Sequence, residues 1–237
     1  MLDRCTLARV THRSTCALVA LALVGLACGG KSQPRPPIPD AQVAAPPVPR
    51  KLLLVSAGNA FLEGALLVIP DPESHKVPDV DQLTPTELDR RVASGSLPRY
   101  SAIILDDHTP PALPPSVPLL YFNPVGAHAP FPIRARVAHP RVIAVDDKHP
   151  ITRWLTFSET RFDDAAIFEL DAARGDISLV TLDGGPTIAA GRLAGRRVVA
   201  CGFTLSTTDL PLRQAFLLLL SNALDWLEGR PERSPTM

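Results

Sequence analysis

The chain has 237 residues, and its 24 lysines and arginines balance its 24 aspartates and glutamates. A neutral chain without a cluster of basic side chains gives no case for a nucleic-acid partner. Of the four cysteines only Cys201 lies beyond residue 28, which excludes an internal disulfide in the body of the protein. The body therefore depends on a hydrophobic core.

The first 27 residues are typical of an export signal. Three arginines precede an apolar run, residues 16–28, that is shorter than the roughly 20 apolar residues of a membrane-spanning helix. The run ends in GLACGG, which resembles the lipobox of bacterial lipoproteins. This predicts a signal peptide over 1–27 and a lipid on Cys28. A plain secretory signal cleaved nearby is the alternative.

Residues 28–50 are rich in proline and small side chains. Proline fixes φ and removes a backbone donor, so this stretch favours an extended tether and cannot build a core. The globular body is predicted over 51–229, and a disordered tail over 230–237. This organisation predicts a domain held in the cell envelope by a lipid and facing the periplasm, on either the inner or the outer membrane.

The first half of the body alternates predicted strands and helices. The continuous apolar run KLLLVSAG favours a central strand covered on both faces. LTPTELDRRVA carries a helix start, with Thr84 as N-cap, Pro85 at the first position and Glu87 three residues after the cap. YSAIIL and VPLLYF predict two more buried strands. Such alternation is typical of an α/β layer fold with a largely parallel sheet.

The second half contains short apolar runs separated by glycine-bearing turns. This pattern favours antiparallel strands or hairpins at one side of the sheet. The runs are 165–170, 177–182, 186–193 and 196–203.

The chain closes with a predicted amphipathic helix that starts at Asp209, its expected N-cap, and ends at Gly229. One face is expected to pack on the sheet and the other to be polar. The apolar face comprises Leu212, Phe216, Leu219, Leu220, Ala223 and Leu227, and the polar face comprises Gln214, Ser221, Asp225 and Glu228.

Three stretches, 51–66, 110–124 and 183–227, resemble one bacterial domain. It is the class I glutamine amidotransferase-like domain at the C-terminus of BatA-type membrane proteins, which also carry a von Willebrand factor A domain. The resemblance implies an α/β, flavodoxin-like three-layer sandwich. Its sheet would be mostly parallel, with an antiparallel hairpin extension in the second half.

The resemblance does not carry over the amidotransferase activity. Class I amidotransferases need a cysteine nucleophile on a sharp strand-to-helix turn, with a histidine and a glutamate arriving later in the chain. Here the equivalent turn follows YSAIIL and holds Asp106, Asp107 and His108, and the prolines after it oppose a helix. Cys201 is interpreted as a buried residue of a late core strand. We therefore expect no catalytic residue, no metal and no cofactor.

Two similar acidic strings, LDDHTPP (105–111) and VDDKHP (145–150), each follow an apolar stretch. We favour turns, because aspartate accepts local backbone donors and proline stops a strand. The alternative is a metal or small-ligand site outside the carboxyl ends of the strands. Neither string has a diagnostic ligand spacing, and the sequence does not show that they meet. The candidate ligands are Asp106, Asp107, His108, Asp146, Asp147 and His149.

The sequence thus predicts a lipid-anchored, catalytically inactive accessory or scaffold domain of a cell-envelope assembly. By analogy, its partner would be an envelope protein of the BatA or MoxR ATPase type. Two alternatives stay open: a hydrolase, or a domain that binds a small ligand or metal, each using the loop from Asp106 to His108. The separation of His108 and His149 distinguishes a joint site from two separate turns.

Overall fold

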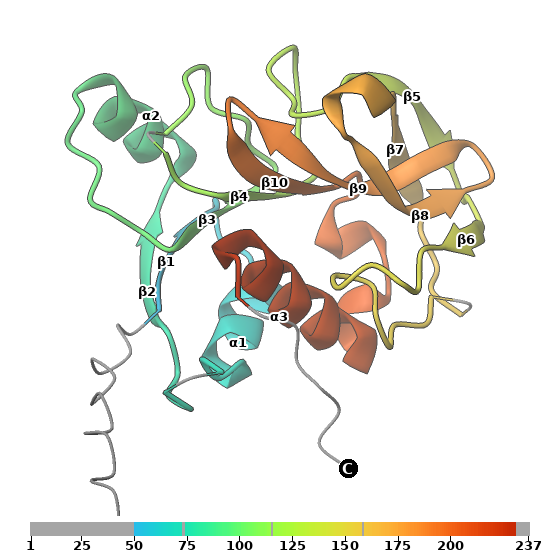
Figure 1. Ribbon diagram of the computed structural model, residues 1–237, viewed down its shortest axis with the longest axis horizontal. Helices are drawn as coiled ribbons and strands as arrows, with labels where there is room; N and C mark the ends of the chain where they lie inside the picture. Colours follow the sequence, from blue (N-terminus) through green and yellow to red (C-terminus); the bar gives the residue numbers. More distant parts are fainter. Residues whose placement is uncertain (1–49, 73, 115, 158, 231–237) are drawn as a thin grey trace, which may run out of the picture. The chain divides into compact units, whose positions relative to one another are not determined.

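A sheet of eight strands, in the order β2-β1-β3-β4-β10-β9-β8-β6, forms the centre of the fold (Figure 1). The computed structural model describes residues 50–230 except 73, 115 and 158, so the predicted signal peptide, Cys28, most of the tether and the tail lie outside the described residues. The strands are β1 (Lys51–Val55), β2 (Asp79–Leu83), β3 (Ala102–Asp106), β4 (Leu119–Phe122), β5 (Ile133–Ala138), β6 (Val142–Val145), β7 (Asp164–Phe168), β8 (Ile177–Leu182), β9 (Gly185–Leu193) and β10 (Arg196–Cys201). The α-helices are α1 (Ala60–Val68), α2 (Pro85–Ala93) and α3 (Gln214–Glu228).

Five neighbouring strands of this sheet, β2, β1, β3, β4 and β10, are parallel. The order 2-1-3-4 followed by one more parallel strand is the doubly wound order of flavodoxin-like folds. The predicted α/β fold with a mostly parallel sheet is confirmed.

The other end of the sheet is antiparallel: β10 pairs with β9, β9 with β8 and β8 with β6, each in the antiparallel direction. The predicted hairpin extension is therefore confirmed, with two differences. The run 196–203 also pairs in parallel with β4. The run 165–170 contributes β7, which pairs with β5 in a separate two-stranded sheet. Sequence analysis missed β5 because its side chains are mostly exposed and include two arginines, so it shows no apolar run.

Helices cover both faces of the sheet: α1 and α3 lie on one face and α2 on the other (Figure 1). Alternate residues of β1 belong to the two hydrophobic cores, Leu52 and Leu54 to one and Leu53 and Val55 to the other. A strand with both faces buried reads as a continuous apolar run, as the sequence predicted. Thr84 caps α2 as predicted, accepting a hydrogen bond from the backbone N of Glu87 (3.3 Å).

The last helix begins four residues later than predicted, with Arg213 rather than Asp209 at its N-cap position. A 3-10 turn, η3 (Leu210–Leu212), precedes it, and the carboxylate of Asp209 does not cap α3. Asp209 instead pairs with Arg213 (2.6 Å) and accepts a hydrogen bond from the backbone N of Arg161 (2.9 Å). Gly229 ends the helix in the left-handed conformation (φ 75°), as expected. Within the described residues, no helix combines the length and apolar character needed to cross a bilayer.

A buried ionic cluster corrects the predicted polar face of α3. Asp225 and Glu228 accept hydrogen bonds from the fully buried side chain of Arg50, with Arg50 Nη2 to Asp225 Oδ1 at 2.6 Å and Arg50 Nε to Glu228 Oε1 at 2.9 Å. Arg230 joins Glu228 (2.6 Å) to Asp71 (2.8 Å). We call these five residues the Arg50 cluster. Sequence analysis placed Arg50 in the proline-rich tether, where nothing signals a buried partner.

The Arg50 cluster predicts a dependence of stability on acid pH. Burial acts to raise the pKa of Asp71, but hydrogen bonds from Ser74 and Arg230 outweigh it and lower the pKa from 3.8 to about 2. A carboxylate whose folded pKa is depressed stabilises the fold above its unfolded pKa, and this contribution is lost as pH falls through the folded value. We expect Asp71→Asn to lower the Tm at neutral pH, by an amount that shrinks between about pH 4 and pH 2. Thermal unfolding of both proteins across that range tests this, and a constant difference would contradict it.

Candidate functional site

A pocket of about 280 Å³ opens at the carboxyl ends of β1 and β3. From β1 the chain continues to the neighbouring strand β2 on one side, and from β3 it continues to β4 on the other side. The point where the strand order reverses in this way is the topological switch point, where open α/β sheets bind their ligands.

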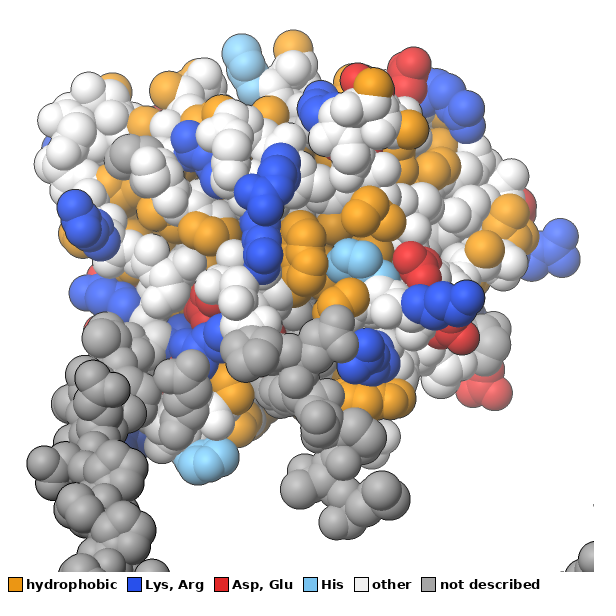
Figure 2. All heavy atoms as spheres, viewed as in Figure 1, with side chains coloured by type: hydrophobic (Ala, Val, Ile, Leu, Met, Phe, Trp, Pro, Cys, Tyr) orange, Lys and Arg blue, Asp and Glu red, His pale blue; other side chains and the backbone are white. Residues whose placement is uncertain are grey.

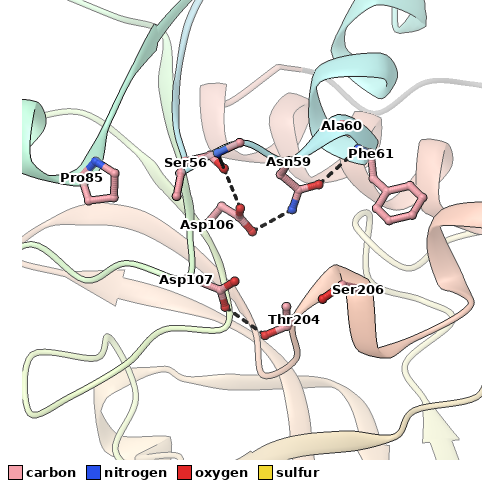
Figure 3. A pocket seen from close by; sticks show the side chains of 11 residues that line it. Ser56, Asn59, Ala60, Phe61, Pro85, Asp106, Asp107, Thr204 and Ser206 are labelled. Carbon is pink, nitrogen blue, oxygen red and sulfur yellow. Dashed lines mark hydrogen bonds between the residues drawn. The ribbon is translucent and has the colours of Figure 1, made fainter.

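Asp106, the last residue of β3, forms the floor of this pocket. Its side chain is largely buried, with the residue 6% exposed, and its two oxygens accept hydrogen bonds from Ser56 Oγ (2.8 Å) and Asn59 Nδ2 (3.0 Å) (Figure 3). Burial raises the pKa of Asp106, the two hydrogen bonds oppose this rise, and the neighbouring charge of Asp107 adds to it. The pocket therefore contains a carboxyl group that holds its proton more tightly than an ordinary aspartate.

The loop between β1 and α1 positions both partners of Asp106. Asn59 is the N-cap of α1, and its Oδ1 accepts hydrogen bonds from the backbone N of Phe61 (3.2 Å) and Leu62 (3.3 Å). That contact leaves Nδ2 directed at Asp106. Gly58, at φ 115°, lets the loop turn sharply and donates its backbone N–H to Ser56 Oγ (3.0 Å). Asn59 therefore caps α1 and holds Asp106 at the same time.

Ser56 and Asn59 were not among the predicted site residues. The serine fell within the apolar run assigned to a central strand, and the asparagine was given no role. The signal that could have found them is the string SAGN, which places a hydroxyl, a glycine and a capping amide directly between a buried strand and a helix.

Asp107 lies at the corner directly after β3. It adopts a left-handed backbone (φ 50°), and its carboxylate accepts hydrogen bonds from Asn123 Nδ2 (2.6 Å) and Thr204 Oγ1 (2.9 Å). Asn123, after β4, is left-handed as well (φ 47°). Aspartate and asparagine adopt this conformation more readily than other residues with a side chain, because their short polar groups form local hydrogen bonds. In the described part of the segment between β3 and β4, no helix follows this corner.

His108 does not line the pocket. Its Nε2 lies 3.0 Å from Asp89 Oδ1, so the imidazole joins the loop after β3 to α2. This contact gives His108 a structural partner outside the pocket.

The second acidic string lies elsewhere. β6 is five positions from β3 in the sheet, about 24 Å at the usual spacing of strands. It also runs antiparallel to β3, so Asp146, Asp147 and His149 lie at the opposite edge. There Asp146 accepts a hydrogen bond from the backbone N of Lys148 (3.2 Å), and His149 packs against Trp226 (5.6 Å between ring centres). The two strings do not meet. No set of three or more histidine, cysteine, aspartate or glutamate side chains in the described residues is arranged to hold a metal ion.

Cys201 ends β10 and is completely buried, as its interpretation as a core residue predicted. Burial raises the pKa of its thiol far above the ordinary value. Because the thiolate is the nucleophilic form, this cysteine does not supply the missing amidotransferase nucleophile.

The residues that line the pocket include two carboxylates, from Asp106 and Asp107, and no lysine, arginine or histidine. Hydroxyl groups of Thr204 and Ser206 and the partly exposed ring of Phe61 complete it (Figure 3). On the face seen in Figure 2, lysines and arginines are scattered rather than gathered into one basic patch. The pocket thus offers hydrogen-bond acceptors and an apolar wall without a neutralising cation.

No family model matches the sequence, and no curated protein matches it. Solved structures do. A cytoplasmic protein from Salmonella typhimurium LT2 has a TM-score of 0.55 at 12% identity, over 75% of this chain and 99% of its own. A second cytoplasmic protein from Salmonella typhimurium scores 0.50 at 13% identity, over 75% and 98%. A putative ThuA-like protein from Parabacteroides merdae scores 0.50 at 14% identity, over 79% and 93%.

These likenesses show the fold, which is flavodoxin-like and glutamine amidotransferase-like. They give no support to the BatA context, and the predicted partner of the BatA or MoxR type stays a prediction. The expected location, lipid-anchored in the cell envelope and facing the periplasm, is contradicted. Two of the similar structures are described as cytoplasmic proteins, and we correct that expectation accordingly.

Proposed function

We propose that this protein binds a small, uncharged, polyhydroxylated ligand in the pocket around Asp106. The observation that carries the proposal is the buried carboxylate of Asp106, held by Ser56 and Asn59 at the switch point of the sheet. An ionised carboxylate has about four acceptor positions. Two are used by these neighbours, and the rest can accept hydrogen bonds from ligand hydroxyls.

Charge and shape narrow the class of ligand. Asp106 and Asp107 repel phosphates and carboxylates, because no cation lines the pocket. Hydroxyl groups of a ligand can both donate to these carboxylates and accept from Ser206, whereas the hydroxyl of Thr204 already donates to Asp107 (2.9 Å). Phe61, 41% exposed, offers an apolar surface to the carbon skeleton of a ring. A volume of about 280 Å³ suits a ligand of one ring.

The proposal is tested by thermal shift with glycerol, myo-inositol, glucose and glucose 6-phosphate at millimolar concentrations. A ligand that binds only the folded state raises the Tm by mass action. We expect at least one neutral polyol to give a saturable rise, and the phosphate to give none. Glucosamine serves as the cationic comparison.

Control variants exclude general stabilisation by sugars, which act on any folded protein when concentrated. Asp106→Asn should lose the rise, whereas Asp146→Asn, at the opposite edge of the sheet, should keep it. A rise for the phosphate alone, or an equal rise in both variants, would contradict the proposal.

One observation favours a second candidate, a hydrolase. Ser56 Oγ lies 2.8 Å from the Asp106 carboxylate, whose raised pKa brings it closer to the value suited to a general base. Turnover of glycoside or ester substrates that is lost in Ser56→Ala would favour this candidate over simple binding.

A further inference from the structure

A second, apolar hollow adjoins the pocket around Asp106. This groove, of about 420 Å³, lies between α1 and the segment from η3 into α3, and it shares Ala60 and Phe61 with the pocket. Its apolar side chains are unusually open, with Val68 61% and Leu212 79% exposed. Contiguous exposed apolar surface of this kind on a soluble domain marks a site of interaction.

The groove carries no unpaired charge. Arg213 is the one charged residue among those that line it, and its guanidinium pairs with Asp209 (2.6 Å) and Glu159 (3.6 Å). An apolar occupant of the groove therefore meets no isolated cation.

Gly64 keeps the floor of the groove open. It lies in the middle of α1, where a glycine costs about 1 kcal/mol of stability relative to alanine. A Cβ atom at this position would meet nothing within 4 Å. Packing within the described chain therefore does not require the glycine, and a larger side chain would project into the groove.

We propose that the ligand is an amphiphile, with a polyhydroxylated head in the pocket around Asp106 and a single apolar chain in the groove. This inference rests on the proposed function and names the class of ligand more narrowly. The polar pocket and the apolar groove meet at Ala60 and Phe61, so one molecule can occupy both. From Ala60 to Val68 the helix runs about 12 Å at 1.5 Å per residue, room for a medium-length alkyl chain.

Calorimetric titration with methyl, butyl, hexyl and octyl glucosides, each below its micellar concentration, tests the inference. Each methylene that the groove buries should tighten binding roughly fourfold. Asp106→Asn should weaken every member of the series, because the head anchors the same molecule. Equal affinities along the series would contradict the amphiphile and leave the polyol site standing. If the longer glucosides bind and methyl glucoside does not, that result would contradict the polyol site.

Variants of α1 locate the alkyl chain. In Gly64→Leu the ratio of octyl to methyl affinity should fall to about one, and the Tm should not fall, because leucine is the better helix former. Leu67→Ala, on the same helix but outside the groove, should keep the ratio. An octyl-to-methyl affinity ratio that is unchanged in Gly64→Leu would overturn the inference. So would an affinity for octyl glucoside that is unchanged in Asp106→Asn. So would a dimer in sedimentation that Gly64→Leu dissociates, since a second copy would then fill the groove.

Discussion

Replacing Arg50 with alanine is expected to lower the free energy of unfolding by about 3–5 kcal/mol, because it removes the buried cation that Asp225 and Glu228 share. The side chain of Arg50 is fully buried, and it pairs with Asp225 (2.6 Å) and Glu228 (2.9 Å) of α3. These contacts join the residue before β1 to the last helix, which are 175 and 178 positions apart in sequence. For a domain of this size the Tm should fall by roughly 6–20 °C.

Chemical and thermal unfolding of Arg50→Ala measure this loss. Lys51→Ala is the matched control, because Lys51 is the next residue and also forms an ion pair, with Asp81 (3.1 Å), but its side chain is 41% exposed. Exposed pairs contribute less than about 1 kcal/mol. Equal losses in the two variants would show that the Arg50 cluster does not hold the termini of the domain together.

Asp106→Asn is expected to stabilise the protein at neutral pH and to weaken ligand binding about 10- to 100-fold. The pKa of Asp106 is raised, chiefly by burial, so its carboxyl group favours the fold more when protonated. Its contribution to stability therefore falls as pH rises from the unfolded pKa through the raised folded pKa. Asparagine removes this loss. The amide oxygen of the new side chain can accept a hydrogen bond from Asn59, and its nitrogen can donate one to Ser56, so both contacts are kept.

The measurement is the Tm of parent and Asp106→Asn from acid to neutral pH, together with calorimetric titration of the polyol. The gain in Tm should vanish below about pH 4, where the carboxyl group is protonated in both states. A residue kept for function commonly costs stability. A variant that is less stable than the parent at neutral pH, with unchanged affinity, would assign Asp106 a structural role.

The strands that could be predicted from the sequence are those buried on both faces, because burial requires apolar residues at every position. β1, β3 and β4 are buried on both faces and read as continuous apolar runs, and Thr84 announces α2 by its cap. β5 was not predictable, because a strand that is mostly exposed shows no apolar run to detect. The predicted start of α3 was wrong because the Asp209 carboxylate pairs with Arg213 instead of capping the helix. Helix propensity does not reveal such a contact.

The sequence offered Asp106 and Asp107 only as the alternative to ordinary turns. That alternative rested on their place at the carboxyl end of a buried strand, where such sheets bind ligands. The same reasoning failed for Asp146 and His149, since the direction of β6 puts them at the opposite edge. The partners Ser56 and Asn59 come from a loop 47 to 50 residues away in sequence, and only the strand order brings that loop beside β3.

A structure of the protein with a bound neutral polyol, taken from the thermal-shift panel or the glucoside series, tests the proposed site at the level of atoms. We predict that hydroxyl groups of the ligand lie within hydrogen-bond distance of Asp106, about 2.5–3.0 Å, at the carboxyl ends of β1 and β3. A polyol bound elsewhere, with Asp106 still contacting only Ser56 and Asn59, would contradict the assignment of this pocket.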